Sequence, residues 1–335
     1  AVTMSRHLRS ATQFIIDPVL KKAEPVNLTQ APIGMNQESR ILKIDSTLYL
    51  WSEGLFRISG NEVQQLPSQN TSSNPSFNLS NYKNFQYNIR NRTLESYTLE
   101  NDQLIIYQHS GNISTRCGQL PFSSSIYEAC YFKNKVFTLE YKNGYQICQY
   151  DSSGANRIVV DKFVSSRNFT NIHNAYAYNY LIATEEGILY QKDTTMYLVY
   201  PGGFTKPIPN SPRFKSGSLY LKNKESIYFC ANYQQQPLYH FHKDSFTIIH
   251  QNVNSIRYAF IDSKHNKAAF SLNEVNGYTI VLTDGSNTKK WNTPLIALQI
   301  AIEDKYILYR TGKNMEGYLL DLEAEKLITV PSLPE

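Results

Sequence analysis

Residues 126–160, IYEACYFKNKVFTLEYKNGYQICQYDSSGANRIVV, contain four short stretches rich in aromatic and β-branched residues. Such stretches are typical of strands, because these side chains pack well on a pleated surface. Lys133 and Asn134 separate the first two, and Asn143 with Gly144, the strongest hairpin signal, follows the second. Residues 151–154, DSSG, turn the chain again. We therefore predict four antiparallel strands at 126–132, 135–141, 145–150 and 157–160.

Units of the same kind recur along the chain. The predicted second strands are centred on Tyr49, Tyr97, Phe137, Ile182, Tyr228, Ala269 and Ile307. Their average spacing is about 43 residues, within the range for a four-stranded propeller blade. A β-sandwich would also give many short strands, but without this four-strand period. We therefore predict an all-β fold, a β-propeller of seven four-stranded blades, with six blades as the alternative.

The predicted propeller domain covers residues 38–335 and follows an N-terminal extension at 1–37. Within residues 1–16, hydrophobic residues recur at helical spacing, which predicts a short amphipathic helix followed by an irregular lead-in. Two segments are predicted to be inserted loops: the polar stretch 68–83, and 185–193, which lengthens one hairpin.

Residues 260–291, FIDSKHNKAAFSLNEVNGYTIVLTDGSNTKKW, resemble the TolB-like, WD40-like propeller repeat. In that repeat, turns of the types at 262–266 and 283–286 separate the strands, and Asp and Gly suit such turns through local hydrogen bonds and positive φ. Residues 25–30 resemble the lead-in strand of the same family. The resemblance implies a periplasmic propeller, as in the sensor halves of membrane-bound transcription regulators of the CadC type. Those regulators carry a DNA-binding domain and a membrane helix upstream, and neither is in this sequence.

The charge pattern gives no sign of a nucleic-acid surface. The net charge is +5, but Lys and Arg are scattered, with doublets only at Lys21–Lys22 and Lys289–Lys290. No apolar run is long enough to span a membrane. The chain begins with Ala1 and has no signal peptide, so we expect a processed or excised part of a larger bacterial protein, with a membrane anchor upstream. We predict a periplasmic or extracellular location, with the cytoplasm as the alternative.

The cysteines do not have the spacing of a zinc ribbon. Cys117, Cys130, Cys148 and Cys230 are expected to be buried thiols, with a Cys117–Cys130 bridge as the alternative.

One group of histidines could hold a metal ion. His240 and His242 alternate onto one face of a predicted strand, and His250 lies on the returning strand. Three imidazoles at such spacing could bind Zn²⁺. However, Phe246 and Ile248 would share that face, and a one-residue slip would reverse it. We therefore predict ordinary strand histidines, with no metal and no cofactor.

The sequence contains no nucleophile elbow, phosphate loop or HExxH helix. His109, His173 and His265 have no acidic or nucleophilic partner at a recognisable offset. We therefore predict no catalytic residues and a non-enzymatic domain that binds or senses a protein, small-molecule or glycan ligand. A carbohydrate-active hydrolase with carboxylates at the propeller channel and a protein-assembly scaffold are the alternatives. The predicted binding anchors are the aromatic residues Trp51, Trp291, Tyr190 and Phe77.

Overall fold

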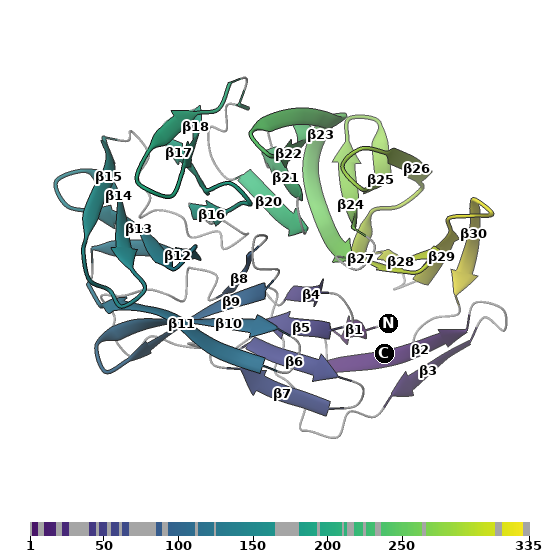
Figure 1. Ribbon diagram of the computed structural model, residues 1–335. Helices are drawn as coiled ribbons and strands as arrows, with labels where there is room; N and C mark the ends of the chain where they lie inside the picture. Colours follow the sequence, from purple (N-terminus) through teal and green to yellow (C-terminus); the bar gives the residue numbers. More distant parts are fainter. Residues whose placement is uncertain are drawn as a thin grey trace. The chain divides into compact units, whose positions relative to one another are not determined.

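The computed structural model (Figure 1) describes most of the chain, and every regular element in the described part is a β-strand. The described residues are 2–5, 10–17, 22–26, 40–44, 47–51, 55–59, 62–66, 85–88, 93–110, 113–123, 125–164, 181–192, 195–209, 211–212, 218–223, 226–231, 236–262, 266–311 and 317–330. None of their segments forms a helix that could cross a membrane. The predicted all-β class is confirmed.

The chain divides into two compact units, which we describe separately. Unit 1 comprises Ala1–Gln65, Cys230–Tyr239 and Ile248–Glu335, and unit 2 comprises Leu66–Phe229 and His240–Thr247.

Three four-stranded antiparallel sheets lie in unit 2. The first contains β8 (Phe85–Asn88), β9 (Thr93–Glu100), β10 (Gln103–Ser110) and β11 (Ile113–Pro121). The second contains β12 (Ile126–Phe132), β13 (Lys135–Tyr141), β14 (Tyr145–Asp151) and β15 (Ile158–Phe163). The third contains β16 (Leu181–Ala183), β17 (Ile188–Lys192), β18 (Thr195–Val199) and β19 (Thr205–Pro207). The strands β20 (Ser218–Asn223) and β21 (Ser226–Ala231) follow.

Unit 1 contains strands from the N-terminal and the C-terminal parts of the chain. In one run, β4 (Arg40–Ile44), β5 (Thr47–Trp51), β6 (Leu55–Ser59) and β7 (Glu62–Leu66) are neighbours in that order. After β22 (Gln236–His242), the long β23 (Ser245–Asp262) pairs with β24 (Lys267–Glu274), which β25 (Gly277–Thr283) and β26 (Thr288–Thr293) extend. The last sheet contains β27 (Ala297–Glu303), β28 (Tyr306–Thr311), β29 (Gly317–Asp321) and β30 (Lys326–Val330).

The β12–β15 sheet confirms the four strands predicted from residues 126–160. Lys133 and Asn134 form the β12–β13 turn with φ of 48° and 59°. Asn143 and Gly144 also have positive φ, but Tyr141 pairs with Tyr145, so their connection has three residues rather than two.

Both faces of the β12–β15 sheet are buried against neighbouring sheets. One face packs on the β8–β11 sheet, where Leu104, Ile106 and Leu120 meet Val136 and Cys148. The other face packs on the β16–β19 sheet through a second apolar cluster that includes Phe137, Ile147 and Tyr190. In unit 1, the β23–β26 strands pack similarly on the β27–β30 sheet. This face-to-face burial explains why consecutive residues on both faces of β14 are buried, although two of them are glutamines.

The β14–β15 turn holds two neighbouring sheets of unit 2 together. The Gln119 backbone N–H, near the end of β11, donates to the Ser152 carbonyl at 2.9 Å. Gly154 in this turn has φ of 83°, and a Cβ atom there would lie 2.8 Å from Cα of Leu120. Only glycine therefore fits both the backbone conformation and the close approach.

The predicted helix in residues 1–16 is wrong. This segment instead contributes β1 (Val2–Ser5) and β2 (Ser10–Asp17), and β3 (Lys22–Val26) completes a three-stranded sheet. The β2 sequence SATQFIID contains Thr12, Ile15 and Ile16, whose β-branched side chains favour a strand over a helix. The predicted lead-in strand at 25–30 coincides with the structure only at the end of β3, and its remaining residues lie outside the described part. The domain limits at 1–37 and 38–335 stay predictions.

The predicted inserted loop at 185–193 is also wrong, because β17 occupies most of it. Ile188, Leu189 and Tyr190 are apolar and buried, so they pack as a strand of the sheet. Ile182 consequently lies in β16, the strand before the one that we predicted. The other predicted loop, 68–83, lies outside the described residues. The count of seven blades stays a prediction.

Candidate functional site

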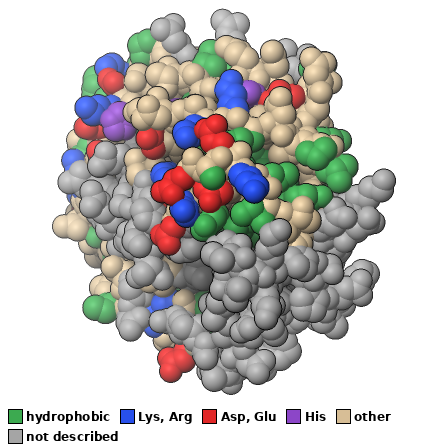
Figure 2. Space-filling view, turned by 90° about the vertical axis from the view of Figure 1, so that its right-hand side faces the viewer, with side chains coloured by type: hydrophobic (Ala, Val, Ile, Leu, Met, Phe, Trp, Pro, Cys, Tyr) green, Lys and Arg blue, Asp and Glu red, His purple; other side chains and the backbone are tan. Residues whose placement is uncertain are grey.

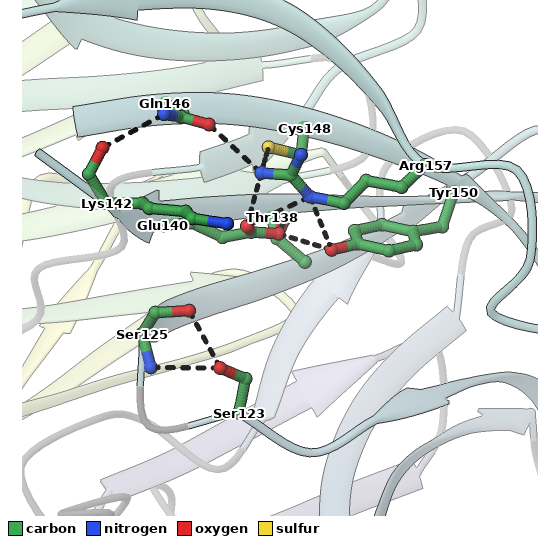
Figure 3. Close-up of polar contacts among 9 residues, drawn as sticks. All are labelled: Ser123, Ser125, Thr138, Glu140, Lys142, Gln146, Cys148, Tyr150 and Arg157. Carbon is green, nitrogen blue, oxygen red and sulfur yellow. Dashed lines mark hydrogen bonds and ion pairs between the residues drawn. The ribbon is translucent and has the colours of Figure 1, made fainter. Parts of the chain in front are cut away.

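A polar cluster on β13, β14 and the turn before β15 is centred on Glu140 (Figure 3). The Glu140 carboxylate accepts hydrogen bonds from the hydroxyls of Thr138 and Tyr150, each at 2.6 Å. Arg157 donates to the same carboxylate through Nη2 at 2.8 Å and Nε at 3.2 Å. The Glu140 side chain is 5% exposed and that of Arg157 is 35% exposed. The cluster is therefore a largely buried ion pair with additional hydroxyl donors.

The two-residue period of the strands assembles this cluster. Thr138 and Glu140 project from one face of β13, and their register partners on β14 are Cys148 and Gln146. Arg157 reaches across the same face, where its Nη2 donates to Gln146 Oε1 at 3.0 Å and lies 3.1 Å from Cys148 Sγ. One side chain thus connects three consecutive segments of the sheet.

The electrostatics fix the protonation states in the cluster. Burial alone would raise the pKa of Glu140, but hydrogen bonds from Arg157, Thr138 and Tyr150 outweigh it, so this pKa lies below its ordinary value. Burial and the nearby Glu140 charge raise the pKa of the Cys148 thiol to about 12. At neutral pH the carboxylate is ionised and the thiol is protonated. Glu140 therefore lacks the proton that a general acid needs, and Cys148 is not a thiolate nucleophile.

A second buried carboxylate lies on the neighbouring sheet. Glu95 on β9 accepts from the Tyr97 hydroxyl at 3.1 Å and from Gln108 Nε2 at 3.2 Å. Glu95 and Glu140 are 0% and 4% exposed. A glycosidase acid must reach its substrate, and these two carboxylates are instead engaged inside the protein.

Two serine hydroxyls lie beside His109, at sequence offsets that form no recognisable motif. His109 on β10 lies with its Nε2 atom 2.7 Å from Ser96 Oγ and its Nδ1 atom 2.8 Å from Ser114 Oγ. Its backbone partner on β9 is Leu94, so Ser96 is the diagonal neighbour on the same face. Ser96 is completely buried, so the arrangement bridges three strands and does not present a nucleophile to substrate.

The predicted aromatic anchors lie in different environments. Tyr190 is 1% exposed, and its ring lies between those of Phe163 and Tyr197. Its hydroxyl donates to Asp161 Oδ2 at 2.5 Å. Tyr190 is therefore not exposed, as a binding anchor on the surface would have to be.

The other three predicted anchors are Trp291, Trp51 and Phe77. Trp291 is partly buried and packs on the apolar cluster of unit 1. Trp51 lies at the end of β5, but the structure does not describe its side chain. Phe77 lies outside the described residues.

The three histidines that could have held a metal ion make different contacts. His240 stacks between Tyr228 and His242, with ring centroids 5.2 and 6.0 Å away. His250 Nε2 lies 2.5 Å from Glu274 Oε1. Among the described residues, no three or more His, Cys, Asp or Glu side chains are grouped as metal ligands would be.

Three of the cysteines have free thiols. These are Cys117, Cys130 and Cys148. Burial raises the pKa of the Cys117 thiol. The predicted alternative, a bridge between Cys117 and Cys130, is therefore not formed.

Among the described residues of unit 2, exposed or partly exposed apolar side chains lie at two sheet edges, and we call four of them the edge residues: Ile158 and Val160 on β15, and Tyr200 and Phe204 on either side of the β18–β19 turn. A β-bulge in β15 leaves Val160 between the register partners of Ile147 and Cys148, so Val160 faces the β16–β19 sheet. A Cβ at Gly203 would lie 3.8 Å from Val160 Cγ2, which places the β18–β19 turn beside β15. Ile158 and Phe204 are 53% and 66% exposed. Sequence reasoning missed these exposed side chains.

Comparisons with known proteins find similar solved structures. No protein-family model and no curated protein sequence matches the chain. Apo AztD from Citrobacter koseri aligns with a TM-score of 0.54 and 13% identity, over 97% of this chain and 93% of that chain. TolB from Acinetobacter baumannii aligns with a TM-score of 0.37 and 11% identity, over 88% and 79% of the two chains.

Two proteases also contain similar folds. The β-propeller domain of the Trilobed protease from Pyrococcus furiosus gives a TM-score of 0.40 at 11% identity, over 96% and 91% of the two chains. The chain spans 34% of the tricorn protease, with a TM-score of 0.30 at 12% identity. The four-stranded antiparallel sheets, packed face to face within each unit, identify this chain as a β-propeller.

Proposed function

We propose that this propeller is a non-enzymatic binding domain whose partner is a protein. The observation that carries the proposal is the exposure of the edge residues Ile158 and Phe204, which are apolar and 53% and 66% exposed. Exposed apolar surface of this kind is typical of protein contact sites. By contrast, Glu95, Glu140 and Ser96 are buried and hydrogen-bonded, which disfavours the hydrolase alternative.

Photo-crosslinking tests this proposal directly. A benzophenone amino acid in place of Phe204, introduced in cells of the source organism, should give one discrete protein adduct. The same replacement of Val275, which is exposed in unit 1, should not. Once identified, the partner should bind the purified chain, and Phe204→Ser should weaken this binding about tenfold or more. Equal labelling from both positions, or no adduct from position 204, would contradict the proposal.

We also propose that the domain works outside the cytoplasm as the sensing part of a larger bacterial protein. The TolB-like repeat at 260–291 supports this, and its turn has the expected geometry: Asp284 Oδ1 accepts from the Ser286 and Asn287 amides, and Gly285 has φ of 94°. The gene sequence upstream of Ala1 tests the proposal. A winged-helix domain and about 20 apolar residues would support it, and a Met codon directly before Ala1 would contradict it.

A further inference from the structure

We propose that an aromatic row at one end of the β12–β15 sheet binds a neutral saccharide. The row consists of Tyr127 on β12, Tyr141 on β13, Tyr145 on β14 and Phe163 on β15. Tyr141 is paired in register with Tyr145, and Tyr145 with Phe163, so these three rings project from one face of the sheet. Tyr127 packs on the apolar cluster that contains Tyr145 and Phe163. This site does not include the edge residues, and the proposal does not depend on the protein-binding function above.

The rings of the aromatic row contact one another from strand to strand. Tyr141 and Tyr127 meet the Tyr145 ring edge to face, with centroids 5.1 and 6.0 Å away. Tyr145 stacks on Phe163 at 5.8 Å. Tyr145 and Phe163 are 6% and 7% exposed, whereas Tyr141 is 49% exposed and Tyr127 is partly exposed. Two accessible tyrosines therefore stand on a buried aromatic base, which holds them in place before a ligand binds.

The two accessible tyrosines carry hydroxyl groups that the described part of the protein does not use. No hydrogen bond of either hydroxyl is observed among the described residues. Partial burial and then the neighbouring Tyr141 raise the pKa of Tyr127, which places the two phenols within electrostatic reach of each other. Each hydroxyl can both donate and accept a hydrogen bond. A ligand on this surface therefore meets two hydroxyl groups as well as two rings.

Serine hydroxyls lie beside Tyr141. The Tyr141 backbone N–H donates to the Ser125 carbonyl at 2.9 Å, and Ser125 Oγ lies 2.8 Å from Ser123 Oγ (Figure 3). Because one of these hydroxyls donates to the other, the second keeps its proton for a further acceptor. Ser123 is exposed, so this acceptor can belong to a ligand.

The aromatic row itself contains no charged side chain. Lys162, which precedes Phe163, is paired in register with Gln146 and therefore projects from the other face of the sheet. Glu128, which follows Tyr127, accepts a hydrogen bond from the Leu181 N–H at 3.2 Å. The surface is therefore suited to an uncharged ligand.

A saccharide matches this combination of groups. A pyranose ring has an apolar face of C–H groups, which can lie on a tyrosine ring, and a rim of hydroxyls, which pair with tyrosine and serine hydroxyls. A phosphate or carboxylate ligand would need cations, and the row has none. A purely apolar ligand would cover the hydroxyls without giving them hydrogen-bond partners, at a cost in free energy.

Affinity electrophoresis of the full chain tests the proposal. Native gels that contain amylopectin, galactomannan or xyloglucan, which are neutral polysaccharides, should retard the protein in at least one case. Tyr141→Ala should weaken the apparent affinity about tenfold or more. Tyr141→Phe keeps the ring and loses the hydroxyl, so it should weaken the affinity about threefold. Phe204→Ser removes an exposed aromatic side chain from another sheet and should leave it unchanged. No retardation in any of these gels, or a retardation that Tyr141→Ala does not reduce, would overturn the proposal.

An acidic polysaccharide distinguishes saccharide recognition from simple attraction of charge. Lys142 follows Tyr141 and is exposed, so it could attract an anionic chain. Lys142→Ala should be retarded by the neutral polysaccharide as strongly as the wild type, and this retardation should persist in high salt. Retardation by alginate alone, lost in Lys142→Ala or in high salt, would overturn the assignment of a neutral ligand.

The outcomes also separate this proposal from the protein-binding function. A chain that is retarded by a neutral polysaccharide but gives no adduct from position 204 supports the saccharide site and contradicts the protein partner. An adduct from position 204 without any retardation has the opposite meaning.

Discussion

Two ion pairs of this propeller show how differently the same chemistry can act. Arg157 and Glu140, in unit 2, are 2.8 Å apart, and the carboxylate is almost completely buried with two further hydroxyl donors. Lys289 and Glu325, in unit 1, are 3.5 Å apart and 57% and 65% exposed. Charged side chains of both signs are interspersed on the face shown in Figure 2. The difference teaches that a short distance between two charges is not enough to stabilise a sheet. An ion pair matters for stability when it is buried away from water and its carboxylate has a full set of hydrogen-bond donors.

The largest effect should come from removing the buried carboxylate. Glu140→Ala leaves the Arg157 guanidinium and the Thr138 and Tyr150 hydroxyls without their common acceptor. Breaking a buried pair costs about 3–5 kcal/mol, and the partial exposure of Arg157 places this site near the lower end. Urea denaturation measures the change. Glu323→Ala, which breaks an exposed pair with Lys305, is the control and should change stability far less.

The turn that brings Arg157 to Glu140 should be the next most sensitive position. Gly154→Ala forces a side chain into a φ of 83° and to 2.8 Å from Leu120 Cα. Strain in the left-handed region costs about 1–2 kcal/mol, and the contact with backbone adds to it. Gly202→Ala is the matched control: its φ is 99°, but a Cβ there meets nothing within 4 Å. Equal losses in both variants would show that the close approach to β11 is unimportant.

Strong acid should weaken the buried Arg157–Glu140 pair. The folded pKa of Glu140 lies below its ordinary value, so its contribution to stability is present above the unfolded pKa, about 4.3, and is lost as the pH falls through the folded pKa. Stability in wild type should therefore fall with acid more steeply than in Glu140→Gln. Parallel curves from thermal melts across this range would contradict the assignment.

Local signals explain what the sequence could predict. The β12–β15 strands were predicted because each turn carries its own residues: Lys133 and Asn134 adopt positive φ, and Gly154 turns the chain. The predicted N-terminal helix failed because residues at helical spacing can also be paired in a sheet by distant strands, as β1 and β3 pair with β2. Spacing within one segment contains no information about such partners.

The polar contacts of His109 and Glu140 depend on the register between neighbouring strands. The sequence predicts this register only where the turn between the strands can be recognised. Asn101 and Asp102 form the β9–β10 turn with positive φ. Had that turn been recognised, its register would have placed Ser96 diagonal to His109. Register alone would not have predicted the Arg157–Glu140 contact, because this contact also depends on the conformation of a long side chain. The orientation of Val160 depended on a bulge in β15, which leaves no local sequence signal.

The smallest effect should come from the exposed pair of the comparison. Lys289→Met removes its cation while keeping the aliphatic length, so Glu325 simply regains water. Exposed pairs contribute about 0–1 kcal/mol and are screened by salt, so the change in unfolding free energy should be below about 0.5 kcal/mol and should vanish in high salt. Urea denaturation at low and high ionic strength measures both. A salt-resistant loss as large as that of Glu140→Ala would mean that this pair is excluded from water in solution, and the contrast between buried and exposed pairs would fail.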